Sequence, residues 1–170
     1  MSDLILVSRI SSPRRRSPQM TIGDILSPVD TADLRASDKA RLLWQLAQRA
    51  QFAVGLPAEL IANELLKREE LGSTGVGHGV AIPHTRLQAL KRPFGFLARL
   101  RPVVDFAAID GKPVDLVFLL LLPTDAGGEQ LNALACVSRK LRDPDVLARL
   151  RSTSGVAALY RTMVDSGNGA

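Results

Sequence analysis

The sequence predicts a three-layer α/β/α sandwich with a mixed β-sheet in the middle. Residues 114–122, VDLVFLLLL, form an apolar run that only Asp115 interrupts. A strand that is apolar at almost every position is expected to be covered on both faces. Two segments with helical apolar spacing precede the predicted strands and three follow them. Helices on both sides of a central apolar strand fit the three-layer arrangement.

The domain is expected to begin with short elements and a long helix. Residues 21–28 predict a brief helical turn that ends at Pro28, and residues 29–36 predict a weak strand. Ser37 is the expected N-cap of the helix that follows, and Gly55 is expected to end it. The apolar positions of this helix recur at helical spacing and are Leu42, Leu43, Leu46, Ala47 and Ala50.

A second helix is predicted to lead into a glycine-rich segment. Pro57 suits the first turn of this helix, and Arg68 falls in its last turn, directly before the glycines. Its predicted apolar face consists of Ala58, Ile61, Ala62, Leu65 and Leu66.

Strands and then three helices are predicted for the rest of the chain. Residues 79–84 indicate a short strand ended by Pro83, residues 94–101 indicate a longer one, and Asp110-Gly111 indicates a turn before the central strand. A helix is expected from about Gly128. Its predicted apolar face is Leu131, Leu134, Ala135, Ser138 and Leu141. The segments 143–152 and 155–165 read as the last two helices.

Length and charge favour one domain with a basic tail. The chain has 170 residues and a net charge of +5. Residues 1–19 hold four arginines against Asp3, a net charge of +3, which leaves +2 for the remainder. Without the tail the case for a nucleic-acid surface largely disappears. We expect a disordered basic extension at 1–19, one domain at 20–165 and a flexible C-terminus at 166–170. The alternative that the extension is a basic arm that binds anionic partners stays open.

The sequence argues against membrane insertion and against disulfide bonds. Its longest apolar run, at residues 114–122, is too short to span a bilayer. The tail lacks the apolar core of a secretory signal. The single cysteine, Cys136, cannot form an internal disulfide, which fits a reducing cytoplasm.

The segment GSTGVGHGVAIPHTRL, residues 72–87, holds both histidines of the chain, His78 and His84. Its glycine spacing matches neither a Walker A loop nor the dinucleotide fingerprint. Two histidines six residues apart, without cysteine or carboxylate neighbours, make a poor metal site. The sequence suggests no partners for a nucleophilic serine. The imidazole itself therefore remains as the candidate reactive group.

A histidine nucleophile would suit a phosphoryl electrophile here. Glycines such as Gly75 let backbone N–H groups point at an anion, and Ser73 and Thr74 add hydroxyl donors. Arg68 and Arg86 are cations that pair with phosphate oxygens. From these residues alone a plainer interpretation stays open, in which the glycines form a tight loop and His84 caps a strand.

A family resemblance supports the phosphoryl interpretation. The segment LLKREELGSTGVGHGVAIPHTRL, residues 65–87, resembles the active-site signature of phosphotransferase-system enzyme IIA domains of the fructose/mannitol type. Within that family, the pattern GSTGxGxGxAIPH is typical of the nitrogen-regulatory branch. The resemblance extends over about residues 20–165, including 114–122 and the segment 131–143. It implies an α/β/α sandwich with a mixed sheet.

The resemblance also assigns roles by position. His84 matches the phosphorylated histidine of the family, and Arg68 matches its phosphate-facing arginine. Gln130 stands where the family usually has a second histidine. Glutamine can donate a hydrogen bond to a phosphoryl group, but it cannot take up a proton. His78 falls at a variable position and is expected to be a loop residue.

The implied protein is a phosphohistidine carrier rather than a stand-alone enzyme. His84 would accept a phosphoryl group from an HPr-like phosphocarrier, with support from Arg68, Ser73, Thr74, the loop amides and Gln130, and without metal or cofactor. The pattern and the lack of an attached IIB or membrane domain favour a regulatory protein whose targets include sensor kinases or potassium transporters. A sugar-uptake IIA that passes the group to a IIB component, and a binding module that is not phosphorylated, stay open.

Overall fold

The structure is a computed structural model that describes residues 19–125 and 127–166. Residues 1–18 and 167–170 hold nearly all of the predicted extension and C-terminus, so those two predictions lie outside the described residues. The described elements are, in chain order, the 3-10 helices η1 (Ile22–Asp24) and η2 (Pro28–Asp30), β1 (Thr31–Leu34), α1 (Lys39–Val54), α2 (Ala58–Glu70), β2 (Gly75–Gly77), β3 (Val80–Ala81), β4 (His84–Leu87), β5 (Phe94–Val104), β6 (Val114–Pro123), α3 (Gly128–Lys140), α4 (Pro144–Ser152) and α5 (Val156–Val164).

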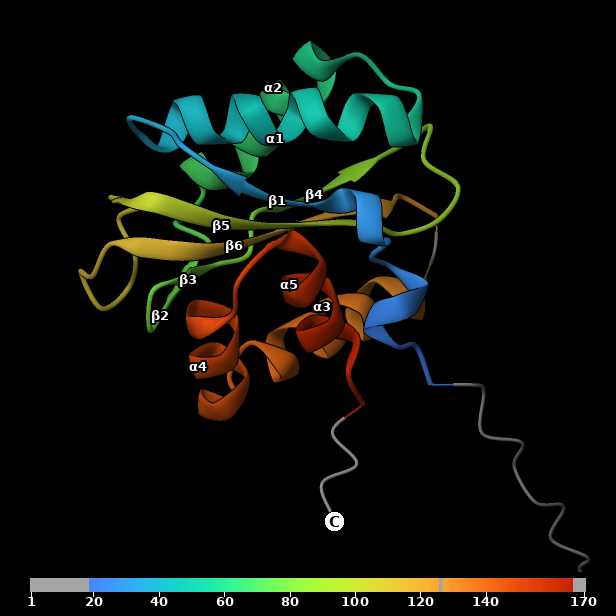
Figure 1. Ribbon diagram of the computed structural model, residues 1–170. Coiled ribbons are helices and arrows are strands. Elements are labelled where there is room, and N and C mark those ends of the chain that lie inside the picture. Colours follow the sequence, from blue (N-terminus) through green and yellow to red (C-terminus); the bar gives the residue numbers. More distant parts are fainter. Residues whose placement is uncertain (1–18, 126, 167–170) are drawn as a thin grey trace, which may run out of the picture.

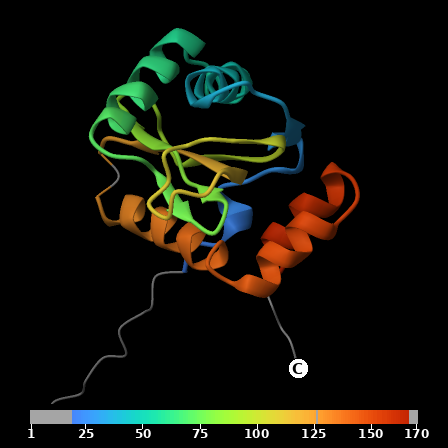
Figure 2. The same cartoon turned by 90° about the vertical axis from the view of Figure 1, so that its left-hand side faces the viewer.

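The strands form one mixed sheet between two layers of helices (Figure 1). β5 and β6 pair antiparallel in its middle. β1 runs parallel to β5, while β3 and β4 run parallel to β6 and β2 pairs antiparallel with β3. Helices α1 and α2 cover one face, and α3, α4 and α5 cover the other, as the rotated view in Figure 2 also shows. The predicted three-layer α/β/α sandwich is confirmed.

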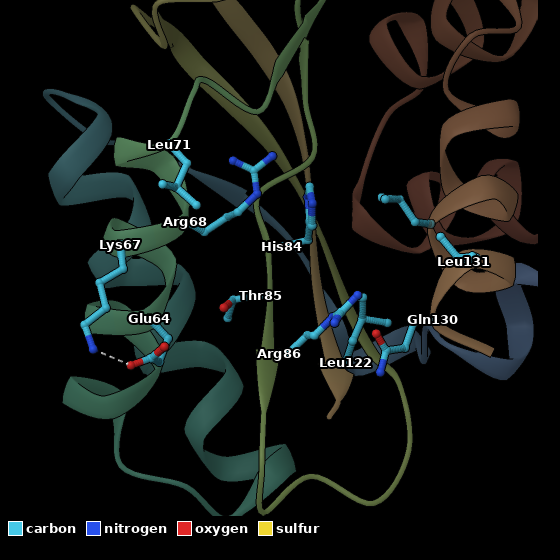
Figure 3. Close-up of a pocket in the computed structure, with 11 residues that line it drawn as sticks. Glu64, Lys67, Arg68, Leu71, His84, Thr85, Arg86, Leu122, Gln130 and Leu131 are labelled. Carbon is cyan, nitrogen blue, oxygen red and sulfur yellow. Dashed lines mark hydrogen bonds and ion pairs between the residues drawn. The ribbon is translucent and has the colours of Figure 1, made fainter. Parts of the chain in front are cut away.

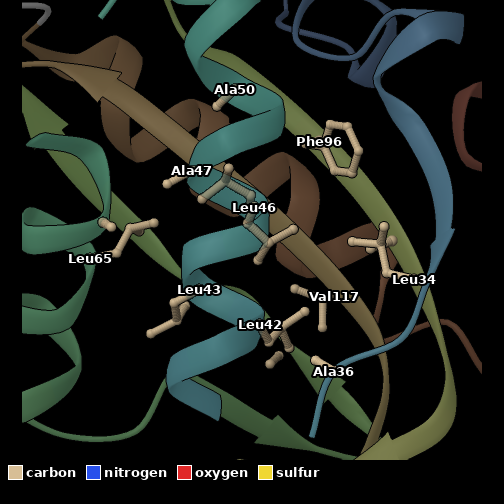
Figure 4. Close-up of a cluster of buried hydrophobic side chains, with 14 of the residues drawn as sticks. Leu34, Ala36, Leu42, Leu43, Leu46, Ala47, Ala50, Leu65, Phe96 and Val117 are labelled. Carbon is tan, nitrogen blue, oxygen red and sulfur yellow. The ribbon is translucent and has the colours of Figure 1, made fainter. Parts of the chain in front are cut away.

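Strand β6 supplies both halves of the core. Its side chains alternate between the faces, as the period of a strand requires. Leu119 and Leu121 pack with α1 and α2, in the same cluster as Val117, which Figure 4 shows beneath α1. Phe118 and Leu120 pack with α3, α4 and α5. All five are fully buried. The continuous apolar run therefore has the explanation that the sequence predicted, a central strand covered on both faces.

The predicted boundaries of α1 need one correction. All five of its predicted apolar residues are buried, and Gly55 ends the helix in the left-handed conformation with φ 70°. The N-cap, however, is Asp38 rather than Ser37. The Asp38 carboxylate accepts a hydrogen bond of 2.8 Å from the Arg41 N–H, while the Ser37 hydroxyl donates to the other carboxylate oxygen at 2.7 Å. Serine and aspartate are about equally good N-caps, and the negative charge of Asp38 is additionally favoured by the positive end of the helix dipole.

The predicted face of α3 agrees only in part with the observed one. Leu141 is buried and Leu134 packs partly buried against the core as predicted, but Leu131 is 71% exposed, and Ala133 and Val137, which were not predicted, are fully buried. This helix carries apolar residues around much of its circumference, so spacing alone fits more than one face. Packing of α3 against η1 and β6 selects the face. In α2, Leu66 is likewise partly exposed rather than buried.

The strand predicted for residues 79–84 does not end at Pro83. β3 and β4 lie on either side of Pro83 and both pair with β6, with Ala81 opposite Val117 and His84 opposite Leu120. Pro83 has no N–H to donate, but its carbonyl accepts a hydrogen bond of 2.9 Å from the Leu120 N–H. The ladder therefore continues past the proline, and His84 begins a strand instead of ending one.

We predict that Leu119→Ala lowers the free energy of unfolding by about 2–5 kcal/mol, because it removes buried methyl groups and leaves a cavity in the core. Val29→Ala is the control, since Val29 is 86% exposed, and it should change stability by less than about 0.5 kcal/mol. Urea unfolding followed by circular dichroism measures both. Equal losses for the two variants would contradict the central position of β6.

Candidate functional site

The geometry of His84 fixes which of its ring nitrogens can react. Its Nδ1 lies 2.7 Å from the carbonyl oxygen of Ile82, two residues before it. A carbonyl only accepts hydrogen bonds, so Nδ1 must carry the hydrogen. In the neutral ring Nε2 then keeps its lone pair. The Pro83 turn thus selects the tautomer in which Nε2 is the nucleophile.

The surroundings of His84 favour this neutral ring. Burial lowers the pKa of His84, and the positive charges of Arg68 and Arg86 lower it further. The hydrogen bond to Ile82 and the charge of Glu69 act in the opposite direction, but the net shift is downward from 6.5. An imidazole with a depressed pKa is neutral, and therefore nucleophilic, across the neutral pH range.

His84 lies in a cleft at the edge of the sheet, between α2 and α3 (Figure 3). The cleft has a volume of about 460 Å³. β4 contributes His84 and Arg86, which are two residues apart and so point to the same side of the strand. α2 contributes Arg68, and α3 contributes Gln130 from across the cleft. The residues that line the cleft are Glu64, Lys67, Arg68, Leu71, His84, Thr85, Arg86, Leu122, Gln130, Leu131 and Leu134.

Two arginines set the charge of the cleft. Arg68 extends from the last turn of α2, and its Nη1 donates a hydrogen bond of 3.0 Å to the Gly72 carbonyl. Arg86 is exposed on β4. The lining also contains Glu64 and Lys67, which form an ion pair of 2.7 Å, so their opposite charges largely cancel. The arrangement suits a small multivalent anion beside His84.

Gln130 lines the cleft but has both of its amide hydrogens engaged. Its side chain is buried, and Nε2 donates to the Pro123 carbonyl and, at 3.1 Å, to the Thr124 carbonyl. These two carbonyls fix the orientation of the amide, because its oxygen would be repelled there. Donation to a phosphoryl group, which the sequence predicts, would require Gln130 to release one of these carbonyls.

The hydroxyl residues of the glycine-rich segment are not in the cleft lining. Ser73 Oγ donates to the Phe106 carbonyl at 2.8 Å and accepts from the Gly75 N–H at 3.1 Å. The Thr74 N–H and hydroxyl donate to the Glu69 carboxylate at 2.8 and 2.6 Å. In this structure Ser73, Thr74 and Gly75 therefore bind the loop to its neighbours, and the structure does not bring them together with Arg68, His84 and Arg86.

His78 occupies the turn between β2 and β3, outside the cleft lining. It is exposed and has a positive φ of 55°. Its N–H donates to the Asp110 carboxylate at 2.9 Å, and its carbonyl accepts from Arg151. His78 is therefore a loop residue held by its backbone, as the sequence predicted.

The sequence did not identify Glu69 and Lys39. These residues form an ion pair of 2.6 Å that joins the end of α2 to the start of α1. Glu69 is the residue that holds Thr74. Their separation of thirty positions follows no local spacing rule, so only the folded arrangement of the two helices shows the contact.

Across residues 19–125 and 127–166, no group of three or more His, Cys, Asp or Glu side chains could hold a metal ion. The helices of that same part of the chain are all too short or too polar to cross a membrane.

Comparison with known proteins identifies relatives over nearly the whole described chain. Residues 28–165 match the family model described as phosphoenolpyruvate-dependent sugar phosphotransferase system, EIIA 2. A nitrogen regulatory protein of Bradyrhizobium diazoefficiens is 43% identical over 145 residues, which cover 85% of this chain and 95% of the relative. A nitrogen regulatory protein of Pseudomonas aeruginosa is 44% identical over 132 residues, covering 77% and 86%.

A solved structure agrees with these sequence matches. The crystal structure of nitrogen regulatory protein IIA-Ntr from Neisseria meningitidis superimposes with a TM-score of 0.78 at 36% identity. The superposition covers 84% of this chain and 98% of that one.

We predict that the His84 ring titrates below the ordinary histidine value of about 6.5, and that Arg68→Ala raises its pKa, because one of the positive charges that oppose protonation is removed. NMR titration of the ring resonances measures both values. Arg142→Ala, which removes an exposed arginine after α3, is the control and should leave the pKa of His84 unchanged.

Folding lowers the pKa of His84, so the unfolded chain takes up the proton at a higher pH than the folded protein does. The contribution of His84 to stability therefore falls as the pH drops below about 6.5.

Proposed function

Because the chain belongs to the EIIA 2 family of the phosphoenolpyruvate-dependent sugar phosphotransferase system, we propose that it accepts a phosphoryl group on Nε2 of His84 and acts as a regulatory phosphocarrier. The observation that carries the proposal is the hydrogen bond of 2.7 Å between His84 Nδ1 and the Ile82 carbonyl. It selects the tautomer in which Nε2 carries the lone pair, in a cleft beside two arginines, which is the arrangement that a transferable phosphoryl group needs.

The proposed step is a direct transfer between two nitrogen atoms. The lone pair of His84 Nε2 forms the new N–P bond, and the nitrogen of the donor phosphohistidine takes back the electron pair of the bond that breaks. The hydrogen on His84 Nδ1 stays in place. The Ile82 carbonyl that accepts it stabilises the positive charge that develops on the ring. No metal takes part in this step.

Arg68 and Arg86 stabilise the charge of the phosphoryl group during transfer. Both guanidinium groups belong to the cleft lining, and each can donate two hydrogen bonds to oxygens of one phosphoryl group. The transfer depends mostly on such positioning and charge. We propose that Gln130 supports the site through its hydrogen bonds to the Pro123 and Thr124 carbonyls, which fix the connection between β6 and α3. Ser73, Thr74 and Gly75 would support the site by fixing the conformation of the glycine-rich loop.

The donor we propose is an HPr-like phosphocarrier that docks over the cleft. Leu71 is 86% exposed and Leu131 is 71% exposed, and these two residues lie on the α2 and α3 sides of the lining. Exposed leucines around a charged centre suit a protein partner that binds and leaves quickly. The single Cys136 fits an exchange that takes place in the cytoplasm.

We propose regulation as the purpose of the transfer. Relatives at 43% and 44% identity are named nitrogen regulatory protein. The phosphorylation state of His84 would then be the signal that target proteins, such as sensor kinases or potassium transporters, detect. The family description names a sugar phosphotransferase system, so sugar uptake is the second candidate. Rapid transfer from phosphorylated protein to a IIB component would favour uptake over regulation.

His84→Ala should abolish phosphorylation, because it removes the nitrogen that forms the bond. His78→Ala is the matched control and should keep most of the transfer, since His78 lies outside the cleft lining. Incubation with phosphoenolpyruvate, enzyme I and HPr-type carriers, followed by mass spectrometry under alkaline conditions, measures the label and its position. Phosphate on His78, or stoichiometric labelling of His84→Ala, would show that the wrong histidine has been assigned.

Arg68→Ala should slow transfer without abolishing it, because the nucleophile remains and only charge stabilisation is lost. Removal of one such donor costs about 2–4 kcal/mol of barrier, or roughly 30- to 1000-fold in rate. Quench-flow measurement of His84 labelling determines the rate. An unchanged rate would mean that Arg68 does not face the phosphoryl group.

A further inference from the structure

Glu69 is a nearly buried carboxylate directly behind the site. Its side chain is 6% exposed. Oε1 accepts a hydrogen bond of 2.8 Å from the Thr74 N–H, and Oε2 accepts one of 2.6 Å from the Thr74 hydroxyl. Lys39 Nζ lies 2.6 Å from Oε1. Thr74 is therefore held at two atoms by a single carboxylate, and hydrogen bonds to a charged acceptor are stronger than neutral ones.

The residue that Glu69 holds is connected to the ring of His84. The Thr74 carbonyl accepts a hydrogen bond of 2.9 Å from the Ile82 N–H. The Ile82 carbonyl in turn accepts from His84 Nδ1 at 2.7 Å. The successive bonds use different peptide groups, so their effect is mechanical rather than a relay of charge. Each bond fixes the position of the residue that makes the next one.

We propose that Glu69 is a positioning residue for the nucleophile, which acts through Thr74 and Ile82 to hold the ring of His84 with Nε2 toward the cleft. This inference rests on the proposed phosphoryl transfer to His84. Glu69 is outside the cleft lining, so it does not touch the phosphoryl group. A misplacement of the reacting atom by about 1 Å is enough to cost roughly 100-fold in rate.

Lys39 has a separable task in the same cluster. A carboxylate this deeply buried needs a compensating charge, and Lys39 provides it from the first turn of α1. Lys39 Nζ also donates to the Phe106 carbonyl at 3.1 Å and lies 4.7 Å from the centre of the Phe106 ring. Lys39 thus neutralises and anchors Glu69, whereas the two bonds to Thr74 position the loop. Variants at the two residues can distinguish stability from positioning.

The test compares Glu69→Gln with the adjacent Glu70→Gln, which removes the same charge from an exposed residue. Labelling of His84 is measured with phospho-HPr-type carrier and with phosphoramidate, a small donor that needs no docking. Glu69→Gln should lower the maximal rate with both donors by about 10- to 100-fold and leave the KM for the carrier within about twofold. Glu70→Gln should match the wild-type protein.

A second readout does not depend on transfer. In the wild-type protein the hydrogen on His84 Nδ1 should give a protected NMR signal, because Ile82 accepts it. In Glu69→Gln this hydrogen should exchange at least about tenfold faster, and ring nitrogen shifts should report a mixture of tautomers. Lys39→Met should lower the melting temperature but keep the Nδ1 signal, since both bonds from Thr74 to Glu69 remain possible. Thr74→Val removes only the hydroxyl bond, and it provides the same comparison if Glu69→Gln does not fold.

The outcomes are distinguishable from those of the carrier proposal. If the wild-type protein accepts phosphate from neither donor, the proposed function fails, and the NMR comparison still decides the role of Glu69. An unchanged Nδ1 exchange rate in the folded Glu69→Gln or Thr74→Val variant would overturn positioning. Loss of the Nδ1 signal in Lys39→Met to the same extent as in Glu69→Gln would also overturn it, because general stability would then explain both.

Discussion

Burial of β6 on both faces is the constraint on which the rest of the architecture depends. Phe118 and Leu120 require one layer of helices, and Leu119 and Leu121 require another on the opposite side. The two layers extend past the central strands to the sheet edge, where β4 pairs with β6. The cleft is the space that α2 and α3 leave at that edge. The site therefore follows from the way in which the core is covered.

The sequence predicted best what local spacing and burial determine. The central strand, the apolar face of α1 and the end of α1 at Gly55 agree with the structure. The apolar face of α3 agreed only in part, at Leu134 and Leu141, because apolar residues surround that helix and only tertiary packing selects the buried side. Pro83 was expected to end a strand because it has no N–H to donate. Its carbonyl nevertheless accepts a hydrogen bond from β6, and the pairing with β6 continues past the proline.

In the candidate site, the sequence indicated some of the residues that gather, but it wrongly added Ser73, Thr74 and Gly75 and did not indicate what each residue contacts. Arg68, His84, Arg86 and Gln130 do line one cleft. The glycine-rich segment was expected to offer its amides and hydroxyls to an anion, whereas the structure shows close packing there. A Cβ on Gly75 would lie 2.7 Å from that of Ala108, too near for any other residue. The ion-pair partner of Glu69, Lys39, comes from a distant segment, so no motif in a single stretch reveals that contact.

The few charges of the cleft determine what phosphorylation would change. Glu64 and Lys67 offset each other through their ion pair, and Glu69 is paired with Lys39 behind the site. Arg68 and Arg86 therefore set the charge around His84. A phosphoryl group adds about −1.5 to −2 charges at neutral pH, nearly the opposite of what two arginines carry. The surface between the exposed leucines would then change from positive to almost neutral. A partner would make the same apolar contacts with both states but meet a different local charge in each. Its binding free energy would therefore differ between the two states, and such a difference is sufficient for regulation.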